Sequence, residues 1–149
     1  MDYQYIIDQL PYSEPFLFVD EILSVSEERI SGTYIFKKDL FFYEGHFKNN
    51  PITPGVILTE CMAQIGVVCF GIYLLKDKIS SEKINFVLSS TEIDFLLPVF
   101  PEEKVKVVSA SFAKKFLNSG AKNNSVLNFQ KNATKKGKKG TITFLMGFA

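Results

Sequence analysis

Tryptophan is absent from this sequence, and histidine, arginine and cysteine are scarce. With His46 as the only histidine and no Cys-x-x-Cys pair, the chain lacks the donor spacing of a zinc site. Cys61 and Cys69 fall within one helical pattern, where their spacing corresponds to roughly 12 Å, too far for a disulfide. We therefore expect two small buried cysteines in a reducing compartment, and neither a metal site nor a cofactor.

An excess of charge and an uninterrupted membrane-length apolar run are also missing. The formal net charge is +1 with both signs interspersed, which gives no electrostatic footprint for nucleic acid. Residues 56–75 are long enough to suggest a membrane span, but Glu60 and Gln64 interrupt them, and the uninterrupted part at 65–75 is too short to cross. The first residues show no signal peptide. We expect a cytoplasmic protein without nucleic-acid or membrane partners.

Apolar residues are plentiful, at 46% of the 149 residues, and 15 of them are phenylalanines. Together with 22% charged residues, this is the balance of an ordinary globular protein. The length fits a single domain, 1–149, that buries a substantial core of its own.

The hydrophobic pattern predicts one long helix and about six strands. Residues 53–76 are apolar on almost every side, so this helix should be buried all round. Thr53 suits its N-cap, and Pro54 suits its first position, where a missing N–H costs nothing. The remaining pattern predicts a short helix at 3–10, a long connection at 38–50, and strands at 16–25, 29–37, 83–97, 104–116, 121–134 and 140–148.

These elements predict an α+β fold in which a curved antiparallel sheet wraps around one long central helix. A strongly curved sheet buries such a helix without a second layer. Because the sheet would keep open edges unless they are paired, we also expect a dimer.

Residues 41–64 concentrate the chemistry of the chain. His46 can remove a proton near neutral pH. The unpaired N–H groups of the first helical turn, at Gly55 and Val56, can hold a polarised carbonyl oxygen, and Gly55 lets it approach closely. Glu60 lies among apolar neighbours, where desolvation would keep it protonated and available as an acid.

A polarised carbonyl, a base and an acid together suit the dehydration of a 3-hydroxyacyl compound. The base takes the proton alpha to the carbonyl, and the acid protonates the departing hydroxyl, since hydroxide is a poor leaving group. Glu60 follows Gly55 after a helical rotation of about 500°, so it points well away from that residue. We hypothesise that His46 and Glu60 meet across a dimer interface rather than within one subunit.

Several motifs closely resemble the hotdog-fold 3-hydroxyacyl-[acyl carrier protein] dehydratases of the FabZ type. The loop and helix carry Gly45-His46-Phe47, Pro51-Ile52, Pro54-Gly55-Val56 and Glu60-x-Met62-Ala63-Gln64. Matches to the opening segment and to a later loop extend the resemblance over nearly the whole chain: Leu10-Pro11, Pro15-Phe16-Leu17-Phe18-Val19-Asp20, Asp94-Phe95 and Pro98-Val99-x-Pro101.

The resemblance implies a hotdog fold and the conversion of a carrier-linked 3-hydroxyacyl thioester to the trans-2-enoyl thioester. The pathway would be fatty acid biosynthesis or a related polyene or lipid pathway, and the assembly a homodimer or a trimer of dimers. It implies that His46 is the base, that Glu60 is the acid from the opposite subunit, and that Gly55 binds the thioester. An aromatic residue gates the acyl tunnel in some members, and alignment places it at Phe86.

The sequence departs from the family at a few positions, and two alternative functions stay open. Thr53 replaces the usual methionine, Lys48-Asn49 replaces Pro-Gly, and Leu96-Leu97 stands where basic residues often precede Pro-Val. The alternatives are an acyl thioesterase on the same fold, which needs an acid to activate water, and a non-catalytic acyl-binding partner subunit. Gln64, one turn after Glu60, either orients that carboxylate or only packs.

Overall fold

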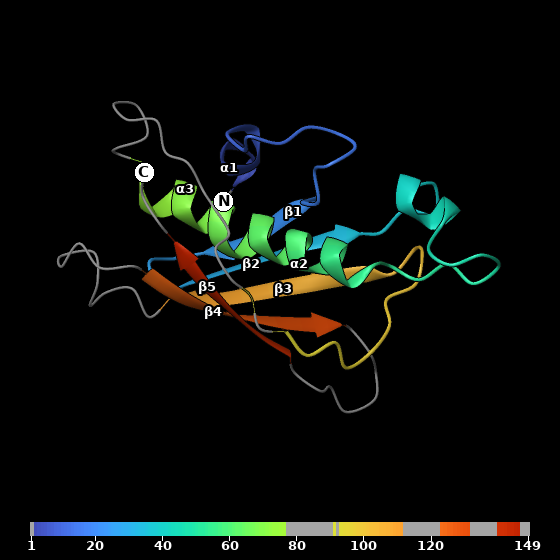
Figure 1. The fold of residues 1–149 in the computed structure, drawn as a ribbon. Helices are drawn as coiled ribbons and strands as arrows, with labels where there is room; N and C mark the ends of the chain where they lie inside the picture. Colours follow the sequence, from blue (N-terminus) through green and yellow to red (C-terminus); the bar gives the residue numbers. More distant parts are fainter. Residues whose placement is uncertain (1, 77–90, 92, 112–122, 132–139, 147–149) are drawn as a thin grey trace.

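A helical stretch from Gly55 to Leu74 lies across one face of a five-stranded antiparallel sheet in the computed structural model (Figure 1). The structure describes residues 2–76, 91, 93–111, 123–131 and 140–146. The strands pair in sequence order, each antiparallel to the next: β1 (Glu21–Val25), β2 (Arg29–Ile35), β3 (Lys104–Ser111), β4 (Asn123–Lys131) and β5 (Gly140–Met146). The predicted arrangement, one long helix against an antiparallel sheet, is confirmed.

The long helix is built from three segments and forms the centre of the core. An α-helical segment comes first, a π-helical segment follows, and a short α-helical segment ends the stretch: α2 (Gly55–Ala63), η2 (Gln64–Cys69) and α3 (Phe70–Leu74). Its length and composition would suffice for a membrane span, yet 78% of the apolar window is buried inside the fold. The rest of the fold therefore supplies the apolar surroundings that this helix needs.

Strand β2 shows why the sheet and the helix fit together. Ile30 and Tyr34 of β2, and Phe36 just after it, are almost fully buried. Tyr34 packs edge-on against Phe18 and Phe36, with ring centroids 5.6 and 5.0 Å apart. At Gly32 the strand carries no side chain, and η2 approaches the backbone there. Ser31 and Thr33, on the opposite face, are buried as well, so β2 is covered on both sides.

Two strand predictions need correction. Residues 16–19 precede β1 without strand pairing, because Phe16 C=O and Phe18 N–H bond to the side chain of Gln64 instead of a neighbouring strand. Contact with β2 begins at Asp20, whose N–H donates to Thr33 C=O at 2.9 Å. The strand predicted at 83–97 lies mostly outside the described residues, and its part at 93–97 is not a strand. β3, β4 and β5 fall inside the other predicted ranges, whose flanking residues lie outside the described part.

The predicted helix start is also wrong by one position. Helix α2 begins at Gly55, with Pro54 as the capping residue and no side-chain cap. The Pro54 carbonyl accepts hydrogen bonds from Ile57 and Leu58 at 2.9 and 3.1 Å. Thr53 does not cap the helix because its hydroxyl bonds to Tyr43.

Two further short elements precede the long helix, and the cysteines lie within it. Helix α1 (Gln4–Asp8) falls inside the predicted range, and η1 (Phe41–Glu44) is a 3₁₀ turn within the connection predicted at 38–50. Cys61 and Cys69 are free and buried, as expected. Burial raises the pKa of Cys69 to about 12, and it also raises the pKa of Cys61 far above its usual range. Both thiols therefore stay protonated and unreactive.

Replacing Gly32 by alanine tests the contact between sheet and helix. The added Cβ would lie 2.9 Å from Cγ2 of Ile65 and 2.8 Å from the backbone oxygen of Glu21. We expect Gly32→Ala to lower the free energy of unfolding by about 1–3 kcal/mol, measured by urea denaturation. Gly45→Ala is the matched control, since its Cβ would meet nothing within 4 Å. Equal stabilities of the two variants would contradict the proposed close contact.

Candidate active site

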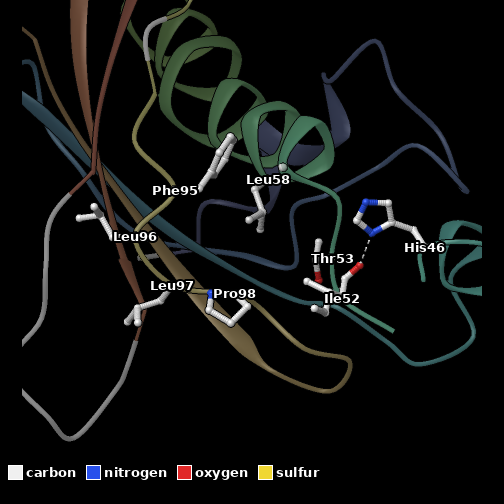
Figure 2. Close-up of a pocket in the computed structure, with 9 residues that line it drawn as sticks. His46, Ile52, Thr53, Leu58, Phe95, Leu96, Leu97 and Pro98 are labelled. Carbon is white, nitrogen blue, oxygen red and sulfur yellow. Dashed lines mark hydrogen bonds between the residues drawn. The ribbon is translucent and has the colours of Figure 1, made fainter. Parts of the chain in front are cut away.

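His46 is held through both its backbone and its ring. Its N–H donates to Phe42 C=O, and its own carbonyl accepts from Ile52 N–H, each at 3.0 Å. Ring atom Nδ1 lies 2.8 Å from the Ile52 carbonyl oxygen (Figure 2). Because a carbonyl oxygen only accepts, Nδ1 carries the proton of the neutral ring, and Nε2 keeps a free lone pair. The ring is thereby fixed in the tautomer that a base requires.

His46 lines a cavity of about 260 Å³ that has two walls. One wall comes from the His46 loop and the helix start, and the other from the segment before β3 (Figure 2). The lining residues are His46, Ile52, Thr53, Gly55 and Leu58 on the first wall, and Phe95, Leu96, Leu97 and Pro98 on the second. Thr53 N–H donates to Val99 C=O at 2.8 Å and so ties the walls together. Apart from His46 and Thr53, these side chains are apolar, which suits an acyl group.

Gly55 lies where the helix start meets the second wall. A Cβ at this position would lie 2.8 Å from two atoms of the Phe95 ring, so a larger residue would require that ring to move. Ile57 N–H is the first to bond back to Pro54 C=O, which places the N–H groups of Gly55 and Val56 ahead of the intrahelical ladder. These N–H groups have no partner within the helix, as the predicted role of Gly55 in holding a carbonyl oxygen requires.

Glu60 is held by Gln64, a fully buried amide that makes three hydrogen bonds. Gln64 Nε2 donates to Glu60 Oε1 and to Phe16 C=O, both at 2.9 Å. Gln64 Oε1 accepts from Phe18 N–H at 2.8 Å. The two roles considered for Gln64 are therefore both present: it packs the N-terminal segment against the helix and it orients the Glu60 carboxylate.

The structure does not bring Glu60 to the cavity of His46 in the same chain. Glu60 is absent from the residues that line this cavity. It lies only half-buried, toward the N-terminal segment that Gln64 holds. Tyr12 belongs to this surrounding: burial raises the pKa of Tyr12, and the nearby charge of Glu60 raises it further. The predicted base and acid thus occupy different places on the subunit.

The remaining predicted site residues are Val56 and Phe86. Val56 is 76% exposed and does not line the cavity. It belongs to a set of exposed apolar residues near the cavity mouth, here called the apolar rim: Phe47, Val56, Phe95, Leu96 and Leu97. The ring of Phe47 stacks on that of His46, with centroids 3.9 Å apart. Phe86, the predicted gate, lies outside the described residues.

Two contributors to the site were not found from the sequence. The Ile52 carbonyl that holds the His46 ring is a backbone group, which every residue has, so no side-chain pattern indicates it. Tyr43 is bonded to Thr53, and nothing in the spacing of these two residues predicts that contact. In the described ranges, from 2–76 to 140–146, no group of three His, Cys, Asp or Glu residues is arranged to hold a metal ion.

Comparisons with known proteins agree with these features. Residues 10–139 match the family model of the FabA-like domain. The 3-hydroxyacyl-[acyl-carrier-protein] dehydratase FabZ of Geobacter metallireducens is 34% identical over 111 residues, which cover 74% of this chain and 73% of the relative. The corresponding FabZ of Lactococcus lactis subsp. cremoris is 29% identical over 145 residues, covering 95% and 92%.

Solved structures with low sequence identity share the architecture. The dehydratase heterocomplex ApeI:P from Xenorhabdus doucetiae matches with a TM-score of 0.71 at 12% identity, covering 95% of this chain and 90% of that one. The zebra fish thioesterase superfamily member 2 matches with a TM-score of 0.63 at 11% identity, covering 97% and 95%. At such identities the likeness concerns the fold alone, and it confirms the predicted hotdog fold.

Replacing Gln64 by leucine tests the buried amide. Gln64→Leu keeps the volume but leaves Phe18 N–H and Phe16 C=O without this partner, so we expect a loss of about 2–4 kcal/mol in the free energy of unfolding. Gln4→Leu is the control, because Gln4 bonds to Asp8 on the exposed surface of α1 and should change stability by less than about 0.5 kcal/mol. Similar losses in chemical denaturation of both variants would refute a special role for Gln64.

Proposed function

Since the chain belongs to the FabA-like domain family, we propose that it is a 3-hydroxyacyl-[acyl carrier protein] dehydratase of the FabZ type. It removes water from a carrier-linked 3-hydroxyacyl thioester and forms the trans-2-enoyl thioester. The observation that carries this proposal is the His46 ring, held by the Ile52 carbonyl so that Nε2 is free, in the wall of an apolar cavity.

The helix start supplies the electrostatic part of the mechanism. The thioester carbonyl points toward the N–H groups of Gly55 and Val56, at the positive end of the helix dipole. Negative charge develops on this oxygen as the alpha proton leaves, and fixed N–H donors stabilise it more strongly in the transition state than in the ground state. The absence of a side chain at Gly55 permits the close approach that this contact requires.

His46 and Glu60 carry the two proton transfers. His46 Nε2 takes the alpha proton, and the resulting imidazolium keeps its Nδ1–H bond to Ile52 C=O. The electron pair of the broken C–H bond forms the double bond between the alpha and beta carbons. As this double bond forms, the bond from the beta carbon to oxygen breaks, and Glu60 donates the proton that lets the oxygen leave as water.

A homodimer brings the two groups together in this proposal. The cavity of one subunit contains His46 but not Glu60, so the acid comes from the second copy. The apolar rim near the cavity mouth supports this arrangement, because several large apolar side chains exposed near one cavity often mark a surface that a partner covers. Each dimer then contains two sites, and each site takes its base and its acid from different chains.

The proposed substrate is attached to acyl carrier protein, and the proposed compartment is the cytoplasm. The apolar lining accepts a fatty acyl chain or the acyl chain of a related polyene or lipid pathway. Leu96 and Leu97 make the mouth uncharged on one side, so carrier docking relies on other residues than the basic ones usual at this position.

Dehydration is tested with purified protein and 3-hydroxyacyl carrier protein, with the 2-enoyl product followed by mass spectrometry. We expect turnover by the unaltered chain and a loss of about 10²–10⁴-fold in kcat for His46→Ala, because the base is gone. Glu44→Gln, an exposed change in the same loop, serves as the control and should retain activity. Release of free acid would indicate a thioesterase instead, and no turnover by the unaltered chain would favour an acyl-binding subunit.

Subunit mixing tests the shared site. His46→Ala and Glu60→Gln proteins should each be inactive, and a mixed dimer of the two should contain one intact site. After complete exchange of an equal mixture, we expect about a quarter of the unaltered activity, since half of the dimers are mixed and each has one working site of two. Distinct tags and native mass spectrometry measure the exchange. Complete exchange without any recovery would show that the site lies within one chain.

A further inference from the structure

The loop that carries His46 is closed by a hydrogen bond between two buried side chains. Tyr43 lies in η1, just before His46, and Thr53 follows Ile52 at the end of the loop. The Tyr43 hydroxyl bonds to Thr53 Oγ1, and the two residues are only 8% and 3% exposed. This bond therefore joins the beginning and the end of the loop from inside the protein.

Thr53 shares a peptide group with the carbonyl that holds the His46 ring. The peptide between Ile52 and Thr53 is planar, so its C=O and N–H point in fixed opposite directions. Its carbonyl oxygen accepts from His46 Nδ1 at 2.8 Å, and its N–H donates to Val99 C=O at 2.8 Å. A rotation of this peptide would weaken both bonds at once. The side chain of Thr53, on the adjacent Cα, is itself held by Tyr43 and therefore adds a restraint against that rotation.

We propose that Tyr43 and Thr53 are a positioning pair for His46: their hydrogen bond fixes the Ile52–Thr53 peptide, which holds the proton on Nδ1 and leaves Nε2 free. The role of Nε2 as a base rests on the proposed function, whereas the tautomer of the ring does not. Thr53 stands where the resembling family usually has methionine, which has no hydroxyl. The pair is thus a feature of this chain's own sequence.

Burial and the protonation of Tyr43 both favour the hydrogen bond between Tyr43 and Thr53. Each hydroxyl is buried, and removing either one leaves the other without this partner, which costs more than losing an exposed bond. Burial raises the pKa of Tyr43; the bond from Thr53 opposes this, while the charges of Glu103 and Glu102 add to it. The Tyr43 phenol therefore stays protonated at neutral pH, and the bond remains intact under assay conditions.

The experiment measures the tautomer of His46 by NMR of ¹⁵N-histidine-labelled protein. His46 is the only histidine, so every ring signal comes from it. We expect a ring protonated at Nδ1 in the unaltered protein and a detectable population protonated at Nε2 in Thr53→Val and in Tyr43→Phe. Thr53→Ser keeps the hydroxyl and should retain the original tautomer. Thr59→Val is the matched control, because it removes a hydroxyl that bonds to Gly55 C=O outside the loop.

Kinetics of the same variants give a second readout. We expect Thr53→Val and Tyr43→Phe each to lower kcat by about tenfold with little change in KM, as a misoriented base would. The double variant should lose no more than either single variant, since both remove the same bond. If Thr53→Val does not fold, Tyr43→Phe, which keeps the ring, carries the test.

Two results would overturn the positioning pair. The first is an unchanged Nδ1–H tautomer in both folded single variants. The second is a loss of kcat in Thr53→Val together with full activity in Tyr43→Phe, which would mean that the Thr53 hydroxyl acts on the substrate directly. If the unaltered protein has no dehydratase activity, the proposed function fails, but the NMR comparison still decides whether the pair positions the ring.

Discussion

The structure depends on burying a helix that is apolar on almost every side. The sheet lies against one face of this helix and the N-terminal segment bonds to it as well, so a polar side chain buried at these contacts is stabilised by a partner inside the protein. Gln64 is such a side chain, and its amide bonds to Phe16 C=O, Phe18 N–H and Glu60 Oε1. One buried amide thereby determines where the N-terminal segment lies and where the Glu60 carboxylate points.

Local hydrophobic pattern was sufficient to predict the main elements. The position of β2 and the approximate extent of the long helix follow from the spacing of apolar residues, which reflects burial. The pattern was insufficient where a distant side chain competed for the backbone. Residues 16–18 have the sequence pattern of a strand, but their backbone groups bond to the side chain of Gln64. Thr53 is a residue type typical of an N-cap, but its hydroxyl bonds to Tyr43. Such competition depends on tertiary contacts that are remote in sequence.

The candidate site could be predicted in part for the same reasons. His46 and Glu60 stand out as rare groups in their surroundings, and helical rotation alone indicated that Glu60 points well away from Gly55. The Ile52 carbonyl and the second wall at Phe95–Pro98 could not be predicted to lie beside His46, because loop closure brings them there. Sequence thus indicates the candidate reactive groups, whereas the fold determines the tautomer of the His46 ring and the residues that enclose it.

The peptide between Ile52 and Thr53 links cavity width to the orientation of the base. One end of this rigid group binds the His46 ring, and the other binds Val99 in the segment that continues the second wall. Moving that segment outward to admit a bulkier acyl chain would also displace the peptide group that orients the imidazole ring. In the proposed dehydratase, a broader substrate range and a well-aligned base are therefore opposed, and widening the cavity at Leu58 would avoid the conflict.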